Sequence, residues 1–315
     1  MTATHVSARI YRYDPSVDAA PRYDTIEVPL EPRMRVLDVL EYAVDHCGIG
    51  LGFRHFCGVK RCGMCGVNVN GKPTLACWEE ATPSMVIEPL GNMPVIRDLT
   101  VDRGAFERAT VELEPRLVRK AAYAGFPEPL THADLQPSFP LMNCIECYVC
   151  SSACPAVAAT PGDDASGHAF VGPGSLVQLA KVALHPKDEL DRSALVEKAG
   201  IENCMTCYRC EEVCPVGIPV VSGAIMPLRA IALDGPNGQA SFPRDFAENV
   251  RANVDVHSAS LFLKTRGFLR AIASVPLAWR MFVRRKTRLF ATASDSAKRS
   301  IRALFEAAGE TGSRR

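Results

Sequence analysis

Cysteine placement is the feature that most restricts what this chain can fold into. Twelve of its 13 cysteines fall into three tight groups of four. Thiols that persist reduced in a cytosol and stand this close together indicate metal ligation, and a disulfide framework is the weaker alternative. Cys47 lies outside the groups, and we expect it to be a buried apolar thiol at the end of a helix over residues 36–46. The groups are Cys57, Cys62, Cys65 and Cys77; Cys144, Cys147, Cys150 and Cys154; and Cys204, Cys207, Cys210 and Cys214.

The first group has the spacing C-x4-C-x2-C, followed after eleven residues by its fourth cysteine. This is the plant-type ferredoxin spacing, in which four thiolates hold one [2Fe–2S] cluster. Gly58, Gly63 and Gly66 permit the tight wrapping of such a loop, whose amide groups can donate hydrogen bonds to sulfur. A structural zinc site also uses four cysteines, but paired C-x2-C knuckles are more usual for zinc. We predict a [2Fe–2S] cluster on Cys57, Cys62, Cys65 and Cys77.

The second and third groups repeat one motif, C-x2-C-x2-C-x3-C-P. In bacterial two-cluster ferredoxins the fourth cysteine of each run binds the cluster of the other run. Because each cluster then takes ligands from both runs, the two runs form one unit although 49 residues separate them. A [3Fe–4S] cluster with Cys207 as a bystander is the alternative for the last cluster. We predict two [4Fe–4S] clusters, one on Cys144, Cys147, Cys150 and Cys214 and the other on Cys154, Cys204, Cys207 and Cys210.

The residues before and around the first group predict a small β-grasp-like domain. Residues 6–13 and 25–29 have the composition of paired strands, and residues 36–44 have helical apolar spacing. Asn70-Gly71 indicates a hairpin turn. We place this plant-type [2Fe–2S] domain over residues 1–105.

The rest of the chain turns helical, so the predicted fold class is α+β. Helical apolar spacing is clearest at residues 176–184 and 193–199, between the two repeated cysteine motifs. We predict an α-helical two-cluster ferredoxin domain over residues 106–235. A basic helical C-terminal extension follows over residues 236–315.

The extension differs from the rest in charge. The 60 residues from Val256 onward contain 13 Lys and Arg against 3 acidic residues, whereas the whole chain carries a net charge of +1. An anionic membrane surface, an acidic partner subunit and a solvated helical tail are all open interpretations. Pro276 is expected to kink or restart the helix. Apolar and basic residues occupy separate helical faces, the first set being Phe268, Ile272, Val275, Trp279 and Phe282 and the second Arg266, Arg270, Arg280, Arg284 and Arg288.

Composition excludes several classes of protein. With 47% hydrophobic and 23% charged residues the chain is that of a folded globular protein. No run of about 18 apolar residues is present, so we expect no bilayer crossing by this chain alone. Its amino terminus shows no apolar signal segment, which predicts a cytosolic location. Nucleic acid is not an expected partner, because no aromatic stacking platform accompanies the basic charge.

The order of the motifs resembles the iron–sulfur subunits of succinate dehydrogenase and fumarate reductase. The likeness covers roughly residues 5–235 and extends to residues 9–13, 75–77, 93–99 and 172–173. The resemblance implies a subunit that relays single electrons between an FAD-containing flavoprotein and a quinone-linked membrane anchor, on the cytoplasmic face of the inner membrane. Such a subunit belongs to an oxidoreductase but carries no catalytic residue of its own.

Three departures from the family pattern bear on the electron partner. A fourth thiolate, Cys207, stands where most members carry another residue and hold a [3Fe–4S] cluster. Residues 156–159 and Met205 replace the tryptophan and histidine of ubiquinone-using members, which favours a different anchor, a lower-potential quinone or a non-quinone donor. Residues 58–61 replace the family's loop that contains Arg-Glu-Gly, and Lys60 with Arg61 is expected to raise the [2Fe–2S] potential, or to form an exposed basic pair facing the flavoprotein.

Two further interpretations stay open. The chain could serve another flavoprotein reductase that uses a soluble or heterodisulfide-like electron partner. The chain could also be a non-redox binding protein with structural zinc, which a finding of about ten irons per chain would exclude.

Overall fold

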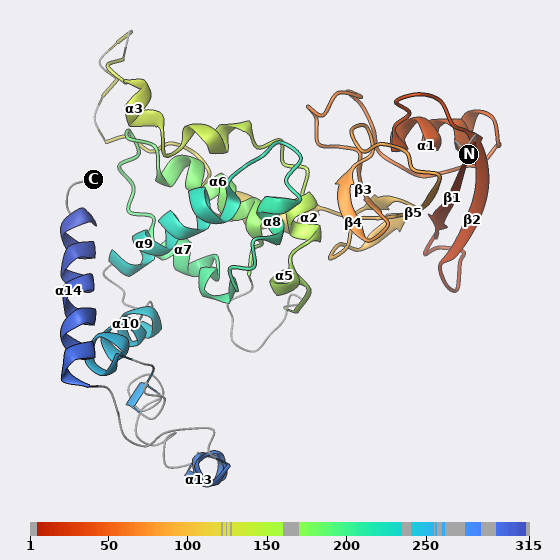
Figure 1. Cartoon of the computed structure of the whole chain (residues 1–315). Helices are drawn as coiled ribbons and strands as arrows, with labels where there is room; N and C mark the ends of the chain where they lie inside the picture. The colour runs from red at the N-terminus through yellow and green to blue at the C-terminus, as the bar shows by residue number, and fades with distance from the viewer. Residues whose placement is uncertain are drawn as a thin grey trace. The chain divides into compact units, whose positions relative to one another are not determined.

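The computed structural model describes residues 5–120, 122–123, 125–126, 128–159, 170–234, 241–254, 256, 260–261, 275–284 and 294–312. The chain divides into two compact units, Met1–Ala232 and Leu233–Arg315 (Figure 1). The first unit contains a β-sheet followed by helices, which confirms the predicted α+β class. The boundary that we place near residue 105 stays a prediction.

A five-stranded mixed sheet forms the amino-terminal part, in the order β2-β1-β5-β3-β4. β1 pairs antiparallel with β2 and parallel with β5, while β3 is antiparallel to β4 and β5. Asn70 and Gly71, with φ of 52° and 81°, make the hairpin turn between β3 and β4. The strands are β1 (His5–Arg12), β2 (Arg22–Pro29), β3 (Gly66–Val69), β4 (Lys72–Leu75) and β5 (Ser84–Glu88), and a separate pair is β6 (Val95–Arg97) with β7 (Thr100–Val101).

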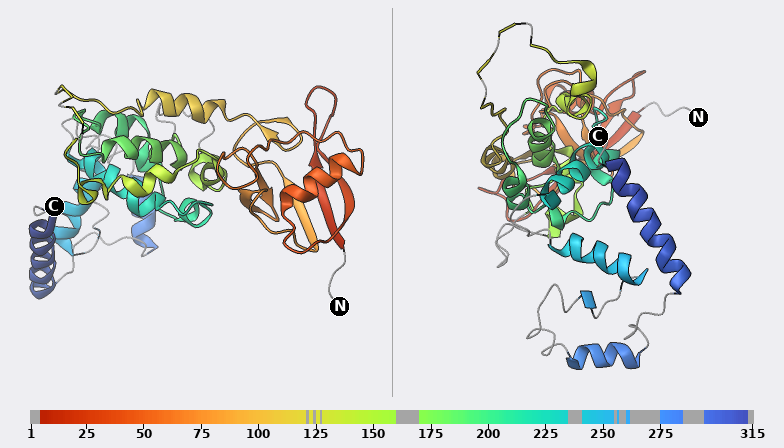
Figure 2. Two further views of the ribbon diagram at one scale, coloured as in Figure 1. Left: turned by 90° about the horizontal axis from the view of Figure 1, so that it is seen from above. Right: turned by 90° about the vertical axis from the view of Figure 1, so that its left-hand side faces the viewer.

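Helix α1 (Val36–Asp45) packs on this sheet (Figure 2). Its buried residues recur at helical spacing, and they join the alternating buried residues of β1 in one apolar core. Fully burying each such aliphatic side chain contributes about 1.5–3 kcal/mol. The buried residues are Val36, Leu37, Val39, Leu40 and Ala43 on α1 and Val6, Ala8 and Ile10 on β1.

The prediction for Cys47 is wrong, because its thiol is exposed. Cys47 would continue the buried stripe four residues after Ala43 if the helix went on. The helix instead ends at Asp45, and Gly48 takes a left-handed φ of 64°. The turn carries Cys47 away from the core.

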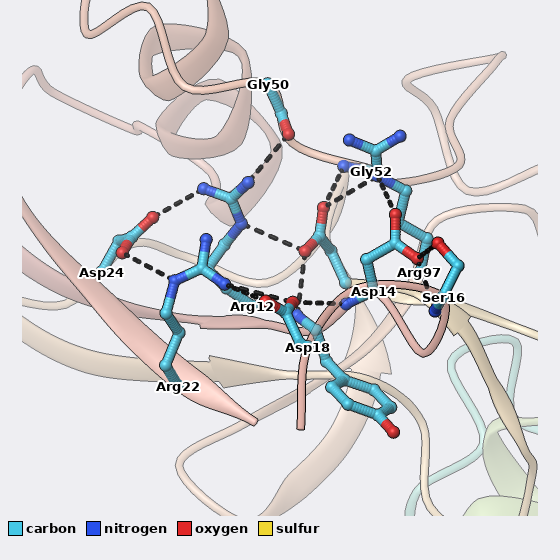
Figure 3. Close-up of polar contacts among 11 residues, drawn as sticks. Arg12, Asp14, Ser16, Asp18, Arg22, Asp24, Gly50, Gly52 and Arg97 are labelled. Carbon is cyan, nitrogen blue, oxygen red and sulfur yellow. Dashed lines mark hydrogen bonds and ion pairs between the residues drawn. The ribbon is translucent and has the colours of Figure 1, made fainter. Parts of the chain in front are cut away.

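A buried ionic network holds the segment that leads into the first cysteine group (Figure 3). The Arg12 guanidinium lies at the end of β1, and its Nε donates to Asp98 Oδ1 at 3.1 Å. The same guanidinium donates to Asp24 at 2.6 Å and to the Gly50 carbonyl at 2.9 Å. Asp98 also accepts the Gly52 amide at 2.8 Å. The chain is thus fixed to the sheet five residues before Cys57.

The helical part of the first unit is built around α6, which is buried over most of its length and packs against α2, η1 and η3. The predicted helices at 176–184 and 193–199 correspond to α6 and α7. The elements are α2 (Gly104–Glu112), α3 (His132–Leu135), η1 (Phe139–Asn143), α4 (Val149–Ser152), α5 (Pro155–Ala159), α6 (Pro173–Ala183), α7 (Ser193–Lys198), η2 (Ile201–Asn203), α8 (Arg209–Glu212), the π-helical η3 (Val220–Ile225) and α9 (Met226–Asp234).

A second buried ion pair ties the segment between the repeated motifs to the residues that follow α2. The side chains of Arg192 and Asp188 are each 2% exposed, and Arg192 Nε lies 2.8 Å from Asp188. Arg192 also donates to the carbonyls of Glu114 and Arg116, both at 2.8 Å. Because its donors have these partners, the buried charge does not stand alone.

In the second unit, α10 (Ser241–Asn253) packs against α14 (Asp295–Gly312), with the Arg251 guanidinium 5.8 Å from the Phe305 ring centre. Pro276, where a kink or restart is expected, is the second residue of helix α13 (Val275–Val283). Of the residues predicted to form its two faces, Phe268, Ile272, Arg266, Arg270 and Arg288 lie outside the described residues. Among the helices described, none combines the length and apolar character needed to cross a membrane.

Candidate iron–sulfur cluster sites

The loop between α1 and β3 wraps its amide groups around the first predicted ligand. The amides of Val59, Arg61 and Cys62 donate to Cys57 Sγ at 3.4, 3.2 and 3.3 Å. These bonds, the Val59 bond most of all, lower the pKa of Cys57 to about 7. Donors that stabilise a thiolate also stabilise the thiolate ligands of a cluster.

The other cysteines of this group lie deeper. Cys65 and Cys77 are buried, the first directly before β3 and the second just after β4. Burial raises the pKa of Cys65 to about 12, and Cys77 and Cys62 contribute to the rise. Beside them, the Lys60 ammonium lies 4.0 Å from the centre of the Trp78 ring. The structure therefore brings the first group together on one loop and the end of one strand.

The two repeated motifs have the same backbone conformation. In each, the residues on either side of the second cysteine are left-handed, and the third cysteine lies in a one-turn helix, α4 or α8. A left-handed φ is uncommon outside glycine, so its recurrence at matched positions marks a common loop geometry. These residues are Glu146 and Tyr148, with φ of 52° and 59°, and Thr206 and Tyr208, with φ of 54° and 63°.

The structure brings Cys214 of the third group to the first three cysteines of the second. Burial raises the pKa of Cys147 to about 12, and the thiols of Cys144 and Cys214 raise it further. The same two neighbours act on Cys150, whose pKa burial raises well above its ordinary value. One pocket is lined by all four of these cysteines.

Cys154 of the second group lies with cysteines of the third group. Its pKa is raised by burial and then by the thiols of Cys204 and Cys207. Burial likewise raises the pKa of Cys210 to about 12, with Cys154, Cys204 and Cys207 adding to it. Within this set Cys207 is exposed and Cys210 is buried. The spatial sets are thus the crossed sets that the motif predicts, and their binding of iron stays a prediction.

Two polar contacts to sulfur were not predicted from the sequence. Gln178 Nε2 on α6 lies 3.3 Å from Cys144 Sγ, and the Ile218 amide donates to Cys214 Sγ at 3.2 Å. Gln178 is a buried amide with apolar residues on both sides in the helix, and that polar interruption is the signal that could have identified it. The Ile218 donor is a backbone amide, so the type of side chain at this position gives no sign of the contact.

The donor set fits iron–sulfur clusters. Thiols whose pKa lies near 12 stay protonated at neutral pH unless a bound cation replaces the proton. Buried sulfurs that accept amide hydrogen bonds are the surroundings in which cluster potentials are set. In the described part of the chain, no three His, Cys, Asp or Glu side chains are grouped for a single metal ion.

The first and second cysteine sets are in direct backbone contact. Gly63, between Cys62 and Cys65, is left-handed with a φ of 68°. A Cβ atom there would lie 2.5 Å from the Ile145 carbonyl oxygen and 3.1 Å from Cys147 Cα. Only glycine permits this approach of the loop that carries the first cysteine group to the next motif.

A side-chain clamp holds the same two parts together. Asn92 Nδ2 lies 2.9 Å from the Ser151 carbonyl, 3.1 Å from that of Ser152 and 3.1 Å from that of Cys154. The Gly91 amide donates to Ser152 Oγ at 2.8 Å. These bonds fix the end of α4 to the sheet domain, and with it the third and fourth cysteines of the second motif.

Two family models match the parts of the chain that carry the three cysteine groups. Residues 7–108 match the 2Fe-2S iron-sulfur cluster binding domain family, and residues 140–218 match the 4Fe-4S dicluster domain family. The chain is 33% identical over 243 residues to the fumarate reductase iron-sulfur subunit of Mycobacterium tuberculosis, covering 74% of this chain and 95% of that one. It belongs to the succinate dehydrogenase and fumarate reductase iron–sulfur subunit family.

A second relative is longer than this chain. It is a subunit of the fumarate reductase (CoM/CoB) of Methanothermobacter marburgensis, 31% identical over 271 residues, which are 86% of this chain and 52% of the relative. The chain therefore spans about half the length of that protein. A chain of the Mycobacterium smegmatis Sdh1 complex in the apo form has the same fold, with a TM-score of 0.66 and 24% identity over 75% of this chain and all of that chain.

Proposed function

We propose that this subunit relays single electrons between an FAD-containing flavoprotein subunit and a membrane-anchor subunit of a succinate dehydrogenase or fumarate reductase-type complex. The observation that carries the proposal is the crossed arrangement, in which Cys214 lies with Cys144 and Cys147 while Cys154 lies with Cys204. A chain with one such pair and a plant-type loop has places for three clusters in a row. We propose that it acts on the cytoplasmic face of the inner membrane.

Each set of sulfurs has a defined task in this proposal. Iron–sulfur clusters supply one-electron redox chemistry, and this chain supplies their ligands. The amides around Cys57 and the Gln178 amide at Cys144 would hold the ligand sulfurs in place and favour negative charge on them. No side chain is required to move a proton.

Metal content and spectroscopy test the proposal. Anaerobically isolated protein is expected to contain about ten irons per chain, as one [2Fe–2S] and two [4Fe–4S] clusters require. Reduction by dithionite should give a [2Fe–2S] electron paramagnetic resonance signal. Protein that contains zinc but neither iron nor acid-labile sulfide would overturn the proposal and favour the structural-zinc interpretation.

The type of the third cluster depends on Cys207. We propose a [4Fe–4S] cluster on Cys154, Cys204, Cys207 and Cys210, with the [3Fe–4S] form as the alternative. Replacing Cys207 by serine is then expected to release about one iron per chain and to convert the cluster to the [3Fe–4S] form, whose oxidised state has a distinctive resonance. Mössbauer spectra and iron counts of the two proteins measure the change. A variant that loses no iron would leave Cys207 as a bystander.

A non-quinone electron partner is the second candidate function. Met205 is 60% exposed next to the first cysteine of the third group, where ubiquinone-using members carry histidine. The Methanothermobacter relative is a CoM/CoB fumarate reductase, which favours coenzymes other than a quinone as electron partners. Reduction of the purified complex by a thiol pair but not by a menaquinol would support this candidate. Rapid reduction by the quinol alone would support the quinone-linked anchor.

We further propose that the C-terminal extension binds an anionic membrane surface. Helix α13 exposes Trp279 and Val283 together with Arg280, and Arg284 directly after it is exposed as well. Each basic residue near an anionic surface contributes about 1 kcal/mol, so replacing both arginines by glutamine should weaken binding at least about tenfold. Co-sedimentation with phosphatidylglycerol vesicles measures this.

The exposed Arg302 on α14 provides the matched control for the vesicle experiment. Its replacement by glutamine should change binding less than the double replacement. Equal binding to phosphatidylcholine and phosphatidylglycerol vesicles would reject the membrane surface in favour of an acidic partner or a solvated tail.

A further inference from the structure

Arg103 lies between the [2Fe–2S] loop and the first repeated motif. It precedes α2 directly, and its Nη2 lies 3.7 Å from Met64 Sδ, in the loop between Cys62 and Cys65. Its guanidinium carbon is 5.4 Å from the centre of the Tyr148 ring, which directly follows Cys147. One side chain thus touches a residue adjacent to a buried cysteine in each of two ligand sets.

The charge of Arg103 is largely removed from water. Its side chain is 17% exposed, and its Nε is buried without a hydrogen-bond partner. One carboxylate reaches it, that of Glu107, at 3.4 Å and with 53% of that side chain exposed. Glu146 and Glu107 both raise the pKa of the nearby Tyr148 hydroxyl, which burial raises most, whereas Arg103 lowers it. An exposed partner is screened by solvent, so the positive charge is only partly compensated.

One small pocket is lined by Arg103 and by one cysteine from each of the two sets. Cys65 and Cys147 both line it, as do Gly63, Met64 and Arg103. A buried N–H without a partner costs free energy. A residue that served only for packing would not need to bury such a group. Methionine would fill much of the same volume and stack on Tyr148 without that cost.

We propose that Arg103 sets the reduction potentials of the first two clusters, raising both by placing a buried positive charge between them. The inference rests on the proposed function, since it needs clusters on both cysteine sets. Adding one electron makes a cluster one charge more negative, and a fixed cation in a low-dielectric site favours that form. The cysteines select the cofactors, whereas Arg103 would determine how readily each accepts the electron.

Potentiometric titration of the holoprotein, with dithionite as reductant and ferricyanide as oxidant, tests the proposal. Electron paramagnetic resonance follows the reduced form of each cluster. In Arg103→Gln and Arg103→Met the ratio of reduced to oxidised [2Fe–2S] cluster at a fixed potential should fall about tenfold, which is 59 mV for one electron. The first [4Fe–4S] cluster should shift in the same direction. Arg103→Lys, which keeps the charge, should restore most of both potentials.

Arg108 provides the matched control, because it is exposed on α2, the helix that Arg103 directly precedes. Arg108→Gln should leave both potentials nearly unchanged. Equal potentials in wild type, Arg103→Gln and Arg103→Met, with cluster signals intact, would overturn the inference and leave Arg103 as a packing residue. A lysine variant that behaves like the methionine variant would do the same. Absence of cluster signals from the wild-type protein would instead refute the proposed function.

Discussion

Replacing Cys214 by alanine is expected to disrupt the same cluster as replacing Cys144, although the two residues belong to different motifs. Both lie in one spatial set, where their charges raise the pKa of Cys147 together. Loss of one of four thiolates should release from about one to about four irons per chain, the same number in both variants, and slow electron transfer past that point. Mössbauer and electron paramagnetic resonance spectra of the two variants should coincide. Iron analysis supplies the count.

The same comparison can be made for the other crossed cysteine, Cys154. Cys154→Ala is expected to match Cys204→Ala, because Cys154 lies with Cys204 and Cys207. Cys47→Ala, outside every group and exposed, should retain all the iron. If Cys214→Ala matched Cys204→Ala instead, each motif would hold its own cluster, and the crossed ligand assignment would be wrong.

Motif spacing predicted the cysteine sets because ligand position along a short loop is a local property. A C-x2-C-x2-C-x3-C-P run fixes its own backbone, including the left-handed residues at matched places such as Tyr148 and Tyr208. The exchange of the fourth cysteine between the two motifs was predicted from the two-cluster ferredoxin pattern. The residues of one motif alone would not have predicted it. The sheet was predictable for a similar reason, since apolar alternation in β1 and the Asn-Gly turn are short-range signals.

Long-range contacts could not be predicted from the sequence. Cys47 continues an apolar stripe, yet where a helix stops depends on the turn after it, so its exposure was missed. Nothing in the sequence around Arg103 shows that it meets Met64 and Tyr148, because those contacts depend on how two parts of the unit pack. The spacing of cysteines within one motif is local in sequence, whereas the contacts of Arg103 join segments that are far apart in the sequence.

Replacing Gly63 by alanine is expected to weaken the contact between the [2Fe–2S] loop and the second motif. The left-handed backbone costs alanine about 1–2 kcal/mol. Its Cβ would also lie 2.5 Å from the Ile145 carbonyl oxygen and 3.1 Å from Cys147 Cα, and backbone atoms cannot move aside as a side chain can. That overpacking adds about 1–3 kcal/mol. The urea concentration at which the visible cluster absorbance is lost should fall, and electrons should pass more slowly from the [2Fe–2S] to the first [4Fe–4S] cluster.

Gly58 separates the two costs. It lies in the same loop with nearly the same φ, 65° against 68°, but a Cβ there would meet nothing within 4 Å. Gly58→Ala therefore carries the backbone cost alone, and the difference between the two variants measures the packing of the loop on Ile145 and Cys147. Equal urea midpoints and equal transfer rates would show that this contact does not couple the two cluster sites. A larger loss in Gly63→Ala would show that the approach of the two backbones requires glycine and supports the electron path between them.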